Sequence, residues 1–393
     1  MRPAPRSRPA IEAGDVIAVR LPAGPQWSDH LGIAWDSGAA LLPLDVRMPE
    51  AEMGALLSRG RPTLLVDGRG WHRLPGGVRG DGSVGLIMAT SGARGEPALV
   101  ELERRAVEHA VHASARRLNS GAGDGWLACL PPSHIGGLLV LLRGLLLGAP
   151  VIIHEGFHPA ALAGAVGSAS FISLVPTMLA RLLDAGVDLS RFRAVLVGGA
   201  AIDARLETRV RERSVAAVPT YGQTQSCGGV VYAGLALEGV EAGIGVAGEV
   251  ELGGATLMRG YRLDQARTAA AFTAGGRLRT GDAGHIDAEG LLHIEGRLDD
   301  LIITGGEKVW PAEVEAVLID HPGVVEAMVT GVPDAEWGMR VIAHIVPREP
   351  SAPPTLEQLR EHVGERLARF KAPTRLVLTA TLARTSLGKA RRR

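Results

Sequence analysis

The chain has 393 residues, of which 46% are hydrophobic and 21% are charged. This length predicts two or three domains, and the composition is typical of a globular protein rather than a disordered or fibrous one. Its 42 basic residues balance 42 acidic ones, so no excess of charge indicates a nucleic-acid partner or an acidic membrane surface. The two cysteines, Cys129 and Cys227, form no disulfide or metal-binding pattern, which favours a reducing cytoplasm.

Short apolar runs alternate with helix-length amphipathic runs over the first three quarters of the chain. The strands expected from this pattern cover 16–21, 63–67, 84–89, 126–130, 150–154, 171–175 and 194–199. The expected helices cover 103–118, 135–147, 159–166, 176–185 and 203–213. Such alternation favours right-handed crossovers and a largely parallel sheet with helices on both faces. The longest apolar run, 135–153, is broken by glycine, arginine and proline, and predicts a buried helix and strand rather than a membrane span.

The pattern changes at residue 243. Short strands separated by glycine-rich turns, such as 248–252 and 291–294, predict a small β-rich subdomain that reaches to about residue 294. The last hundred residues carry their own apolar set, which predicts a separate α+β unit. Its expected elements are helices over 311–320 and 356–370 and strands over 324–332, 340–346 and 376–378.

The expected fold is therefore α/β with two domains. Residues 1–298 would form a large N-terminal domain of mostly parallel sheets flanked by helices, together with the small β-rich subdomain. Residues 299–393 would form a small α+β C-terminal domain that acts as a mobile lid, because Asp299-Asp300 followed by Gly305-Gly306 is typical of a hinge.

Two segments of small residues follow predicted strands. The first is Thr90-Ser91-Gly92-Ala93-Arg94-Gly95-Glu96-Pro97, and the second is Gly198-Gly199-Ala200. Small residues after a strand leave backbone N–H groups open for phosphate oxygens, and parallel sheets bind ligands at the carboxyl ends of their strands. An ordinary structural turn accounts for either segment alone.

Three charged residues in the second half of the chain, each next to a glycine, are further candidates for binding a nucleotide. Asp282 and Arg297 lie fifteen residues apart, and a carboxylate with a guanidinium suits the ribose diol and the phosphate of a nucleotide. Lys389 follows Gly388 near the end of the chain, where a lysine on a mobile loop would neutralise a carboxylate and a phosphate as they combine. A surface ion pair and a solvated tail are the plainer alternatives.

Taken together and in this order, the segments resemble the adenylate-forming superfamily of acyl-CoA synthetases, adenylation domains and luciferases. The resemblance extends from Leu42-Pro43-Leu44-Asp45 to Lys389. It implies that the chain activates a small-molecule carboxylic acid with ATP and Mg²⁺ and transfers the acyl group to CoA. It implies neither a nucleic-acid partner nor a membrane span, and a homodimer is a further expectation.

The resemblance also assigns the nucleotide contacts residue by residue. They are Thr90, Ser91, Gly92, Arg94 and Gly95 in the phosphate loop, Gly198, Gly199 and Ala200 under the adenine, Tyr221 and Gly222 on its face, Thr224 at a phosphate, and Asp282 and Arg297 at the ribose. Four positions depart from the family pattern. Ala93 and Arg94 replace hydroxyl residues, Ala98 replaces a lysine, and Gln225 replaces the glutamate that, beside Thr224, would bind Mg²⁺.

The remaining roles implied by the resemblance concern catalysis and domain movement. His134 would flank the acyl pocket, and the alternative is a histidine that simply begins a helix. Asp299 would be the hinge residue, Gly305-Gly306 the turn that faces the acceptor, and Lys389 the catalytic lysine of adenylation.

Within the superfamily, the segment 226–240 and the ending 384–392 are most similar to the o-succinylbenzoate–CoA ligases of menaquinone biosynthesis. This similarity predicts a cytoplasmic AMP-forming acid–thiol ligase. Two alternatives stay open because of the four departures. One is an adenylating enzyme with a different acid or with an amine as acceptor, and the other is a homologue that binds nucleotide or acyl ligand without turnover.

Overall fold

The computed structural model describes residues 8–90 and 97–382, and its chain divides into two compact units. Unit 1 contains Met1–Ile202, Arg209–Ala242 and Glu251–Arg279, and unit 2 contains Asp203–Thr208, Gly243–Val250 and Thr280–Arg393. Both are built from sheets and helices, so the predicted α/β class is confirmed. The expected domain boundary between residues 298 and 299 stays a prediction.

Unit 1 contains a first seven-stranded sheet in the order β16-β6-β5-β2-β1-β3-β4. The strands are β1 Val16–Val19, β2 Ala40–Pro43, β3 Leu64–Asp67, β4 Gly70–Arg73, β5 Val84–Thr90, β6 Ala98–Glu103 and β16 Gly260–Tyr261. The central strands β3, β1, β2 and β5 are parallel, while β4, β6 and β16 add antiparallel edges. The predicted parallel arrangement is thus confirmed for the middle of this sheet.

A second seven-stranded sheet has the order β13-β12-β11-β10-β9-β7-β8. Its strands are β7 Trp126–Ala128, β8 Val151–Ile153, β9 Phe171–Leu174, β10 Ala194–Val197, β11 Ala217–Gln223, β12 Gly228–Tyr232 and β13 Leu235–Ala236. The five strands from β8 to β11 are parallel, and β12 and β13 turn back antiparallel at the edge. The carboxyl ends of β10 and β11 therefore lie side by side.

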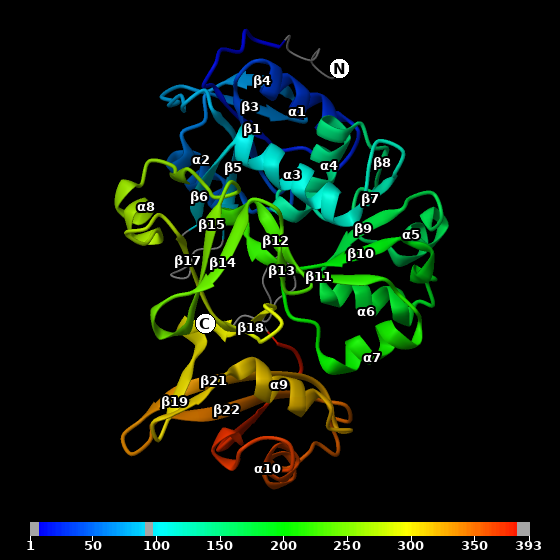
Figure 1. The fold of residues 1–393 in the computed structure, drawn as a ribbon, viewed down its shortest axis with the longest axis vertical. Helices are drawn as coiled ribbons and strands as arrows, with labels where there is room; N and C mark the ends of the chain where they lie inside the picture. The colour runs from blue at the N-terminus through cyan, green and yellow to red at the C-terminus, as the bar shows by residue number, and fades with distance from the viewer. Residues whose placement is uncertain (1–7, 91–96, 383–393) are drawn as a thin grey trace. The chain divides into compact units, whose positions relative to one another are not determined.

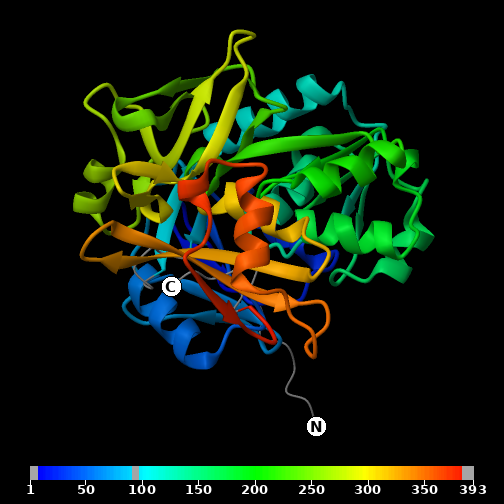
Figure 2. The same cartoon turned by 90° about the horizontal axis from the view of Figure 1, so that it is seen from below.

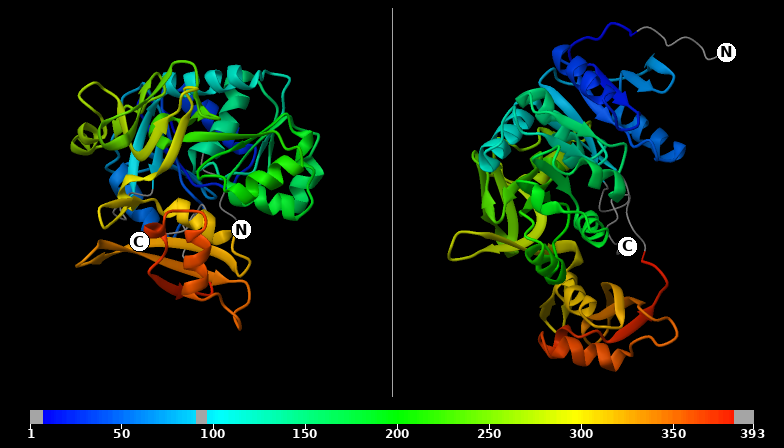
Figure 3. Two further views of the ribbon diagram at one scale, coloured as in Figure 1. Left: turned by 60° about the horizontal axis from the view of Figure 1, so that its bottom comes forward. Right: turned by 90° about the vertical axis from the view of Figure 1, so that its right-hand side faces the viewer.

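Helices cover both faces of this second sheet. The helices of the chain up to residue 271 are α1 Gln26–Asp36, α2 Glu50–Gly60, α3 Arg104–Leu118, α4 Ile135–Leu147, α5 Pro159–Ala165, α6 Pro176–Asp184, α7 Ala204–Glu212 and α8 Gln265–Ala271. Helix α3 packs on β5 and β6, and α4 packs on β7, β8 and β12, so the two helices lie between the two sheets (Figure 1). Helices α5 and α6 lie on the opposite side of the second sheet from α4 (Figure 3).

The long apolar run beginning at Ile135 forms α4 followed by β8, as predicted from its interruptions. Gly148 ends the helix with φ of 67°, a left-handed conformation that glycine adopts without steric cost. Most of α4 is buried because it packs between the second sheet and helices α1 and α3. Within the described ranges, no helix is long and apolar enough to cross a membrane.

The predicted β-rich segment forms a four-stranded sheet in the order β14-β15-β17-β18. The strands are β14 Val240–Ile244, β15 Glu249–Gly254, β17 Leu278–Ile286 and β18 Leu292–Arg297. Strands β17 and β18 form an antiparallel hairpin in which Asp282 pairs with Arg297. The fifteen positions that separate Asp282 from Arg297 therefore form a hairpin, and this hairpin places the two residues opposite each other.

The C-terminal part of unit 2 has a five-stranded sheet with helices on one face (Figure 2). Its elements are β19 Ile302–Thr304, β20 Glu307–Val309, α9 Pro311–Ile319, β21 Val324–Asp334, β22 Gly338–Pro347, α10 Leu356–Gly364 and β23 Arg375–Leu378. The core joins alternate residues of β22, namely Val341, Ala343 and Ile345, to both helices. Because alternate strand residues face the same side, α9 and α10 cover the same face of this sheet.

Unit 1 also contains a buried carboxylate, Asp15, whose side chain has 0% exposure. It accepts hydrogen bonds from the backbone N–H of Glu12 at 3.0 Å, from Arg79 at 3.1 Å and from Arg73 at 3.4 Å. Burial alone would raise the pKa of Asp15, but these donors together hold that pKa below its ordinary value of 3.8. The lowered pKa means that the folded state favours the ionised form.

Replacing Asp15 by asparagine is expected to lower the free energy of unfolding at neutral pH by about 1–3 kcal/mol, because the two arginines lose their acceptor and the amide N–H meets other donors. The stabilisation by Asp15 should be complete above pH 3.8 and should be lost as pH falls through the lower pKa of the folded state. Thermal melts across pH measure this. The exposed Asp29 on α1, changed to asparagine, is the control, and equal stability of both variants would contradict the assignment.

Candidate nucleotide and acyl site

The predicted phosphate loop connects β5 to β6. Thr90 ends β5 and pairs with Ala98 at the start of the antiparallel β6, and its hydroxyl donates to the carbonyl of Ala98 at 3.3 Å. Thr90 is therefore fixed at the base of the loop. Ser91, Gly92, Arg94 and Gly95, which were predicted to bind phosphate, lie outside the described residues together with Ala93.

Gly198, Gly199 and Ala200 follow the carboxyl end of β10, as predicted. A side chain at Gly198 would place its Cβ 2.5 Å from the hydroxyl oxygen of Thr220 on the neighbouring strand β11, and Gly199 has φ of 83°. Only glycine satisfies both conditions, because the first position has no room for a Cβ and the second is left-handed. The turn thus exposes its backbone at the edge of the sheet.

Tyr221, Gly222 and Thr224 lie at the end of β11, which is the next strand of the same sheet. A β-bulge falls between Tyr221 and Gly222, and a Cβ at Gly222 would lie 2.0 Å from the carbonyl oxygen of Gly228. Strands β10 and β11 are parallel neighbours. The structure therefore brings the glycine turn and the Tyr221 segment together at one sheet edge, where α/β proteins bind ligands.

The turn η2, Thr224–Ser226, is held by side-chain hydrogen bonds. The hydroxyl of Ser226 contacts the carbonyl oxygens of Gln223 at 3.0 Å and Gly228 at 3.1 Å. The side-chain amide nitrogen of Gln225 donates to the hydroxyl of Tyr261 at 3.0 Å, and the backbone carbonyl oxygen of Gln225 accepts from the backbone N–H of Met258 at 2.7 Å. These contacts hold the turn against β12 and against the segment 258–261.

These contacts bear on the metal role considered for Gln225 and Thr224. Magnesium prefers carboxylate and phosphate oxygens in an octahedral shell, whereas Gln225 offers a neutral amide that already bonds to Tyr261. The described part of the chain has no group of three or more His, Cys, Asp or Glu side chains that could hold a metal ion. Among the described residues, Thr224 and Gln225 therefore do not by themselves form a magnesium site.

His134 immediately precedes α4, and its position at the start of a helix agrees with the sequence. The first two turns of α4 lie against the segment after η2, because a Cβ at Gly228 would lie 3.6 Å from Ile135 and 2.8 Å from Leu139. His134 is also near Asp45. The paired Arg47 is the main cause that lowers the pKa of Asp45, and the charge of His134 contributes less. The Asp45–Arg47 ion pair, at 2.7 Å, is a feature that sequence reasoning missed.

Asp282 and Arg297 form a direct ion pair in unit 2. The guanidinium of Arg297 donates to the carboxylate of Asp282 at 2.8 Å and to the backbone oxygen of Thr280 at 2.9 Å. Gly281, which lies between Thr280 and Asp282 in the chain, has φ of 71°, and a Cβ there would come within 2.8 Å of the Arg297 guanidinium. The glycine is required at this position because it lets the arginine lie across the strand.

The remaining predicted positions also lie in unit 2. Asp299 is exposed in the turn η4, Leu298–Asp300, between β18 and β19. Gly305 and Gly306 connect β19 to β20 with φ of 58° and 84°, values that a two-residue hairpin turn of this type requires. Lys389 lies outside the described residues. The two groups of predicted site residues belong to different units, and their meeting in one cleft stays a prediction.

The class of the protein follows from its match to known families. Residues 79–245 match the AMP-binding enzymes, and residues 313–389 match the C-terminal domain of AMP-binding enzymes. The chain belongs to this family of AMP-binding enzymes, and the resemblance to adenylate-forming enzymes that its motifs indicated is confirmed.

Individual relatives and solved structures narrow this class. A probable 2-succinylbenzoate–CoA ligase of Mycobacterium tuberculosis is 36% identical over 324 residues, which cover 79% of this chain and 84% of the relative. The 2-succinylbenzoate–CoA ligase of Geobacillus kaustophilus is 30% identical and covers 98% of this chain and 88% of the relative. The structure of the o-succinylbenzoate CoA synthetase of Bacillus subtilis in complex with the acyl-adenylate OSB-AMP matches with a TM-score of 0.88 at 26% identity, and covers 97% and 88% of the two chains.

Proposed function

We propose that this chain is an AMP-forming acid–CoA ligase whose acid is 2-succinylbenzoate. The observation that carries the proposal is the match to the Geobacillus kaustophilus ligase over 98% of this chain. The fold match to the enzyme holding an acyl-adenylate adds support, because its ligand is the intermediate that the proposed reaction forms. A cytoplasmic location belongs to this proposal as well.

The proposed reaction has two steps. A carboxylate oxygen of the acid attacks the α-phosphorus of ATP, the bond to the β-phosphate breaks, and pyrophosphate leaves. The acyl-adenylate formed is a mixed anhydride with an electrophilic carbonyl carbon. The sulfur of CoA then attacks that carbon, the thiol proton is lost, and AMP leaves with the electron pair of the broken C–O bond.

Residues at the edge of the second sheet and residues of unit 2 would each have a part in this reaction. Tyr221 offers an aromatic face for adenine, and the open backbone of Gly199 and Ala200 leaves room for the ring. Asp282 would accept the ribose hydroxyls while Arg297 holds its carboxylate in position. Lys389 would neutralise the charge that develops where carboxylate and α-phosphate meet.

Two alternatives remain because of the departures at Ala93, Arg94, Ala98 and Gln225. A panel of acids separates them from the proposal, with CoA thioester measured by mass spectrometry and pyrophosphate measured in parallel. The proposal expects both products with 2-succinylbenzoate and little of either with benzoate or acetate. Pyrophosphate without thioester would point to another acceptor, such as an amine, and the absence of both with every acid would point to a homologue that binds without turnover.

Changing Gln225 to glutamate is expected to lower the Mg²⁺ concentration needed for half-maximal activity by roughly tenfold, since a carboxylate is a better ligand for a hard cation than an amide. The new carboxylate can accept a hydrogen bond from the Tyr261 hydroxyl in place of the amide contact. Initial rates over a Mg²⁺ titration at fixed ATP measure the effect.

Gln223 provides the matched control, because its change to glutamate adds the same charge two residues away on β11. Its Mg²⁺ dependence should stay like that of the unchanged chain. If the Gln225 variant folds normally but has an unaltered Mg²⁺ titration, residue 225 does not contact the metal.

A further inference from the structure

The carboxylate of Glu249 joins two strands of the four-stranded sheet. Glu249 begins β15 and is half-buried, and its side chain accepts the backbone N–H of Gly281 on β17 at 3.0 Å. The two residues lie 32 positions apart in the chain, and both belong to unit 2. Gly281 directly precedes Asp282, so this bond holds the backbone next to the carboxylate that is proposed to bind ribose.

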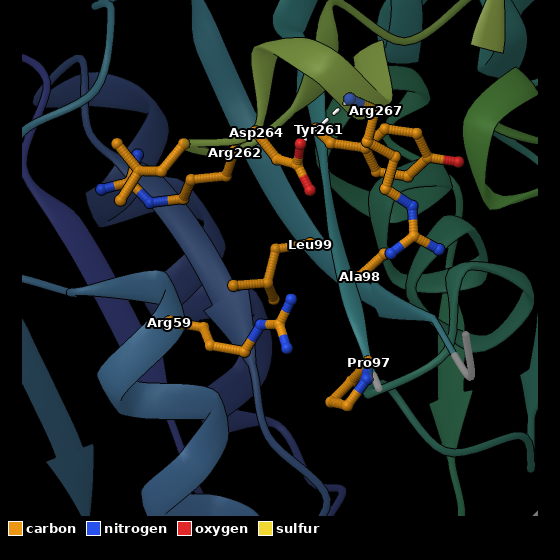
Figure 4. Close-up of a pocket in the computed structure, with 9 residues that line it drawn as sticks. Arg59, Pro97, Ala98, Leu99, Tyr261, Arg262, Asp264 and Arg267 are labelled. Atoms are coloured by element: carbon orange, nitrogen blue, oxygen red, sulfur yellow. Dashed lines mark hydrogen bonds between the residues drawn. The ribbon is translucent and has the colours of Figure 1, made fainter. Parts of the chain in front are cut away.

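This contact differs from the carboxylate bonds that cap helices. Asp264, for example, accepts the backbone N–H of Arg267, three residues later, at 2.9 Å and caps α8 (Figure 4). Such a bond stabilises the first turn of a helix. The bond between Glu249 and Gly281 instead connects two separate strands, so it is not a local cap.

The conformation of Gly281 explains why a side chain accepts its N–H. Gly281 has φ of 71° within β17, and a left-handed residue interrupts the extended conformation of a strand. A backbone N–H that is turned away from the regular strand pairing needs another acceptor. The carboxylate of Glu249 supplies this acceptor, and its charge strengthens the hydrogen bond.

The next residue of β15 holds the other side of the same turn. The backbone oxygen of Val250 accepts the hydroxyl of Thr280 at 2.6 Å, and the oxygen of that hydroxyl accepts the backbone N–H of Asp282 at 3.1 Å. Thr280 is buried, with 3% exposure. Glu249 and Val250 therefore fix the backbone N–H groups of Gly281 and Asp282, one directly and the other through Thr280.

Arg297 completes this arrangement from β18. It donates to the backbone oxygen of Thr280 at 2.9 Å and to the carboxylate of Asp282 at 2.8 Å. The direction of the Asp282 carboxylate is thus set by its backbone, which β15 holds, and by the guanidinium of Arg297. A ligand contact keeps its geometry when residues behind it hold it in this way.

We propose that Glu249 is a positioning residue for the nucleotide, and that it acts through Gly281 on the direction of the Asp282 carboxylate. The proposal rests on the role of Asp282 as the ribose acceptor in the proposed function. The contact requires an acceptor oxygen at residue 249, and a neutral amide oxygen satisfies this requirement in part.

The test is a calorimetric titration of the full chain with AMP, which needs neither acid nor CoA. Glu249→Ala should weaken AMP binding roughly tenfold, the loss expected when one charge-assisted hydrogen bond no longer holds the contact. Glu249→Gln keeps an acceptor oxygen and should bind AMP within about threefold of the unchanged chain. Glu251→Ala removes an equal charge from the same strand and is the control, with binding within about twofold.

A second pair of variants separates positioning from a general loss of stability. Asp282→Asn alone should weaken AMP binding, and adding Glu249→Ala to it should cause less than about twofold further loss, because two residues that act through one contact are not additive. Thermal melts establish that each variant is folded. If the alanine variant unfolds, Glu249→Met replaces it, since methionine keeps the length of the side chain without an oxygen acceptor.

Unaltered AMP binding by folded Glu249→Ala, beside weakened binding by Asp282→Asn, would overturn the proposal and leave the ribose contact standing. A further tenfold loss in the double variant, or an equal loss in Glu249→Gln and Glu249→Ala, would also overturn it. Unaltered binding by Asp282→Asn, or no AMP binding by the unchanged chain, would overturn the ribose contact as well. The expected pattern of AMP binding in a chain without ligase activity would refute the proposed function alone.

Discussion

Alanine in place of Lys389 is expected to lower formation of the acyl-adenylate by roughly 100- to 1,000-fold. The reason is electrostatic, because the carboxylate and the α-phosphate are both negative and their approach needs a cation at the point of attack. In the second step, the sulfur of CoA attacks the carbonyl carbon of the acyl-adenylate. This step does not bring a carboxylate up to a phosphate, so it does not need the same cation. Formation of thioester from supplied acyl-adenylate and CoA should therefore change by less than about threefold, a loss of under 1 kcal/mol in transition-state stabilisation.

Separate assays of the two steps check this prediction, with pyrophosphate release for the first and thioester for the second. Arg392→Ala is the control, since it removes one positive charge from the same end of the chain. An equal loss of both steps in the Lys389 variant would contradict its role in adenylation. A loss in the Arg392 variant of the same size would show that the tail's total charge, rather than Lys389, matters.

Asparagine in place of Asp282 is expected to raise the KM for ATP by roughly tenfold to a hundredfold. The carboxylate is the acceptor proposed for the ribose hydroxyls, and it is held by Arg297 at 2.8 Å. Loss of one charge-assisted hydrogen bond weakens binding by about 1.5–3 kcal/mol, which corresponds to this range. The KM for the acid should be little changed, because the carboxyl group of the acid has no contact with this pair in the proposal.

Asp287 at the far end of the same hairpin supplies the comparison. It is paired with His293 at 2.6 Å, and Asp287→Asn removes an equal charge from the same two strands. Its KM for ATP should stay within about twofold of the unchanged value, a difference of less than 0.5 kcal/mol. If both variants had the same KM, the hairpin's charge and not the Asp282 carboxylate would determine nucleotide binding.

The helices that the sequence predicts best are those with strong apolar patterns. The bounds of α4 agree with the prediction at both ends, because an apolar run ends at a glycine that adopts the left-handed conformation. Helices α1 and α2 were not predicted. Helix α2 contains Gly54, and the left-handed residue that follows its last residue Gly60 is Arg61, with φ of 43°, so its apolar pattern is interrupted and the left-handed position is not a glycine. The last helix is shorter than expected and ends at Gly364.

The candidate site was predictable where its residues follow strands. Gly198 and Tyr221 lie at the ends of β10 and β11. Because neighbouring parallel strands end at the same edge of a sheet, their proximity can be predicted without knowledge of any side-chain contact. The hydrogen bond between Gln225 and Tyr261 was not predictable, because it joins side chains 36 residues apart. Such contacts depend on packing between segments and leave no spacing signal in the sequence.

In the proposed function, this chain couples cleavage of ATP to activation of an organic acid. Exchange of labelled pyrophosphate into ATP tests it most directly, because the exchange requires reversible acyl-adenylate formation and needs no CoA. We expect exchange that depends on 2-succinylbenzoate and on Mg²⁺, and that disappears in the Lys389→Ala variant. Folded protein that gives no acid-dependent exchange at millimolar ATP would contradict the claim.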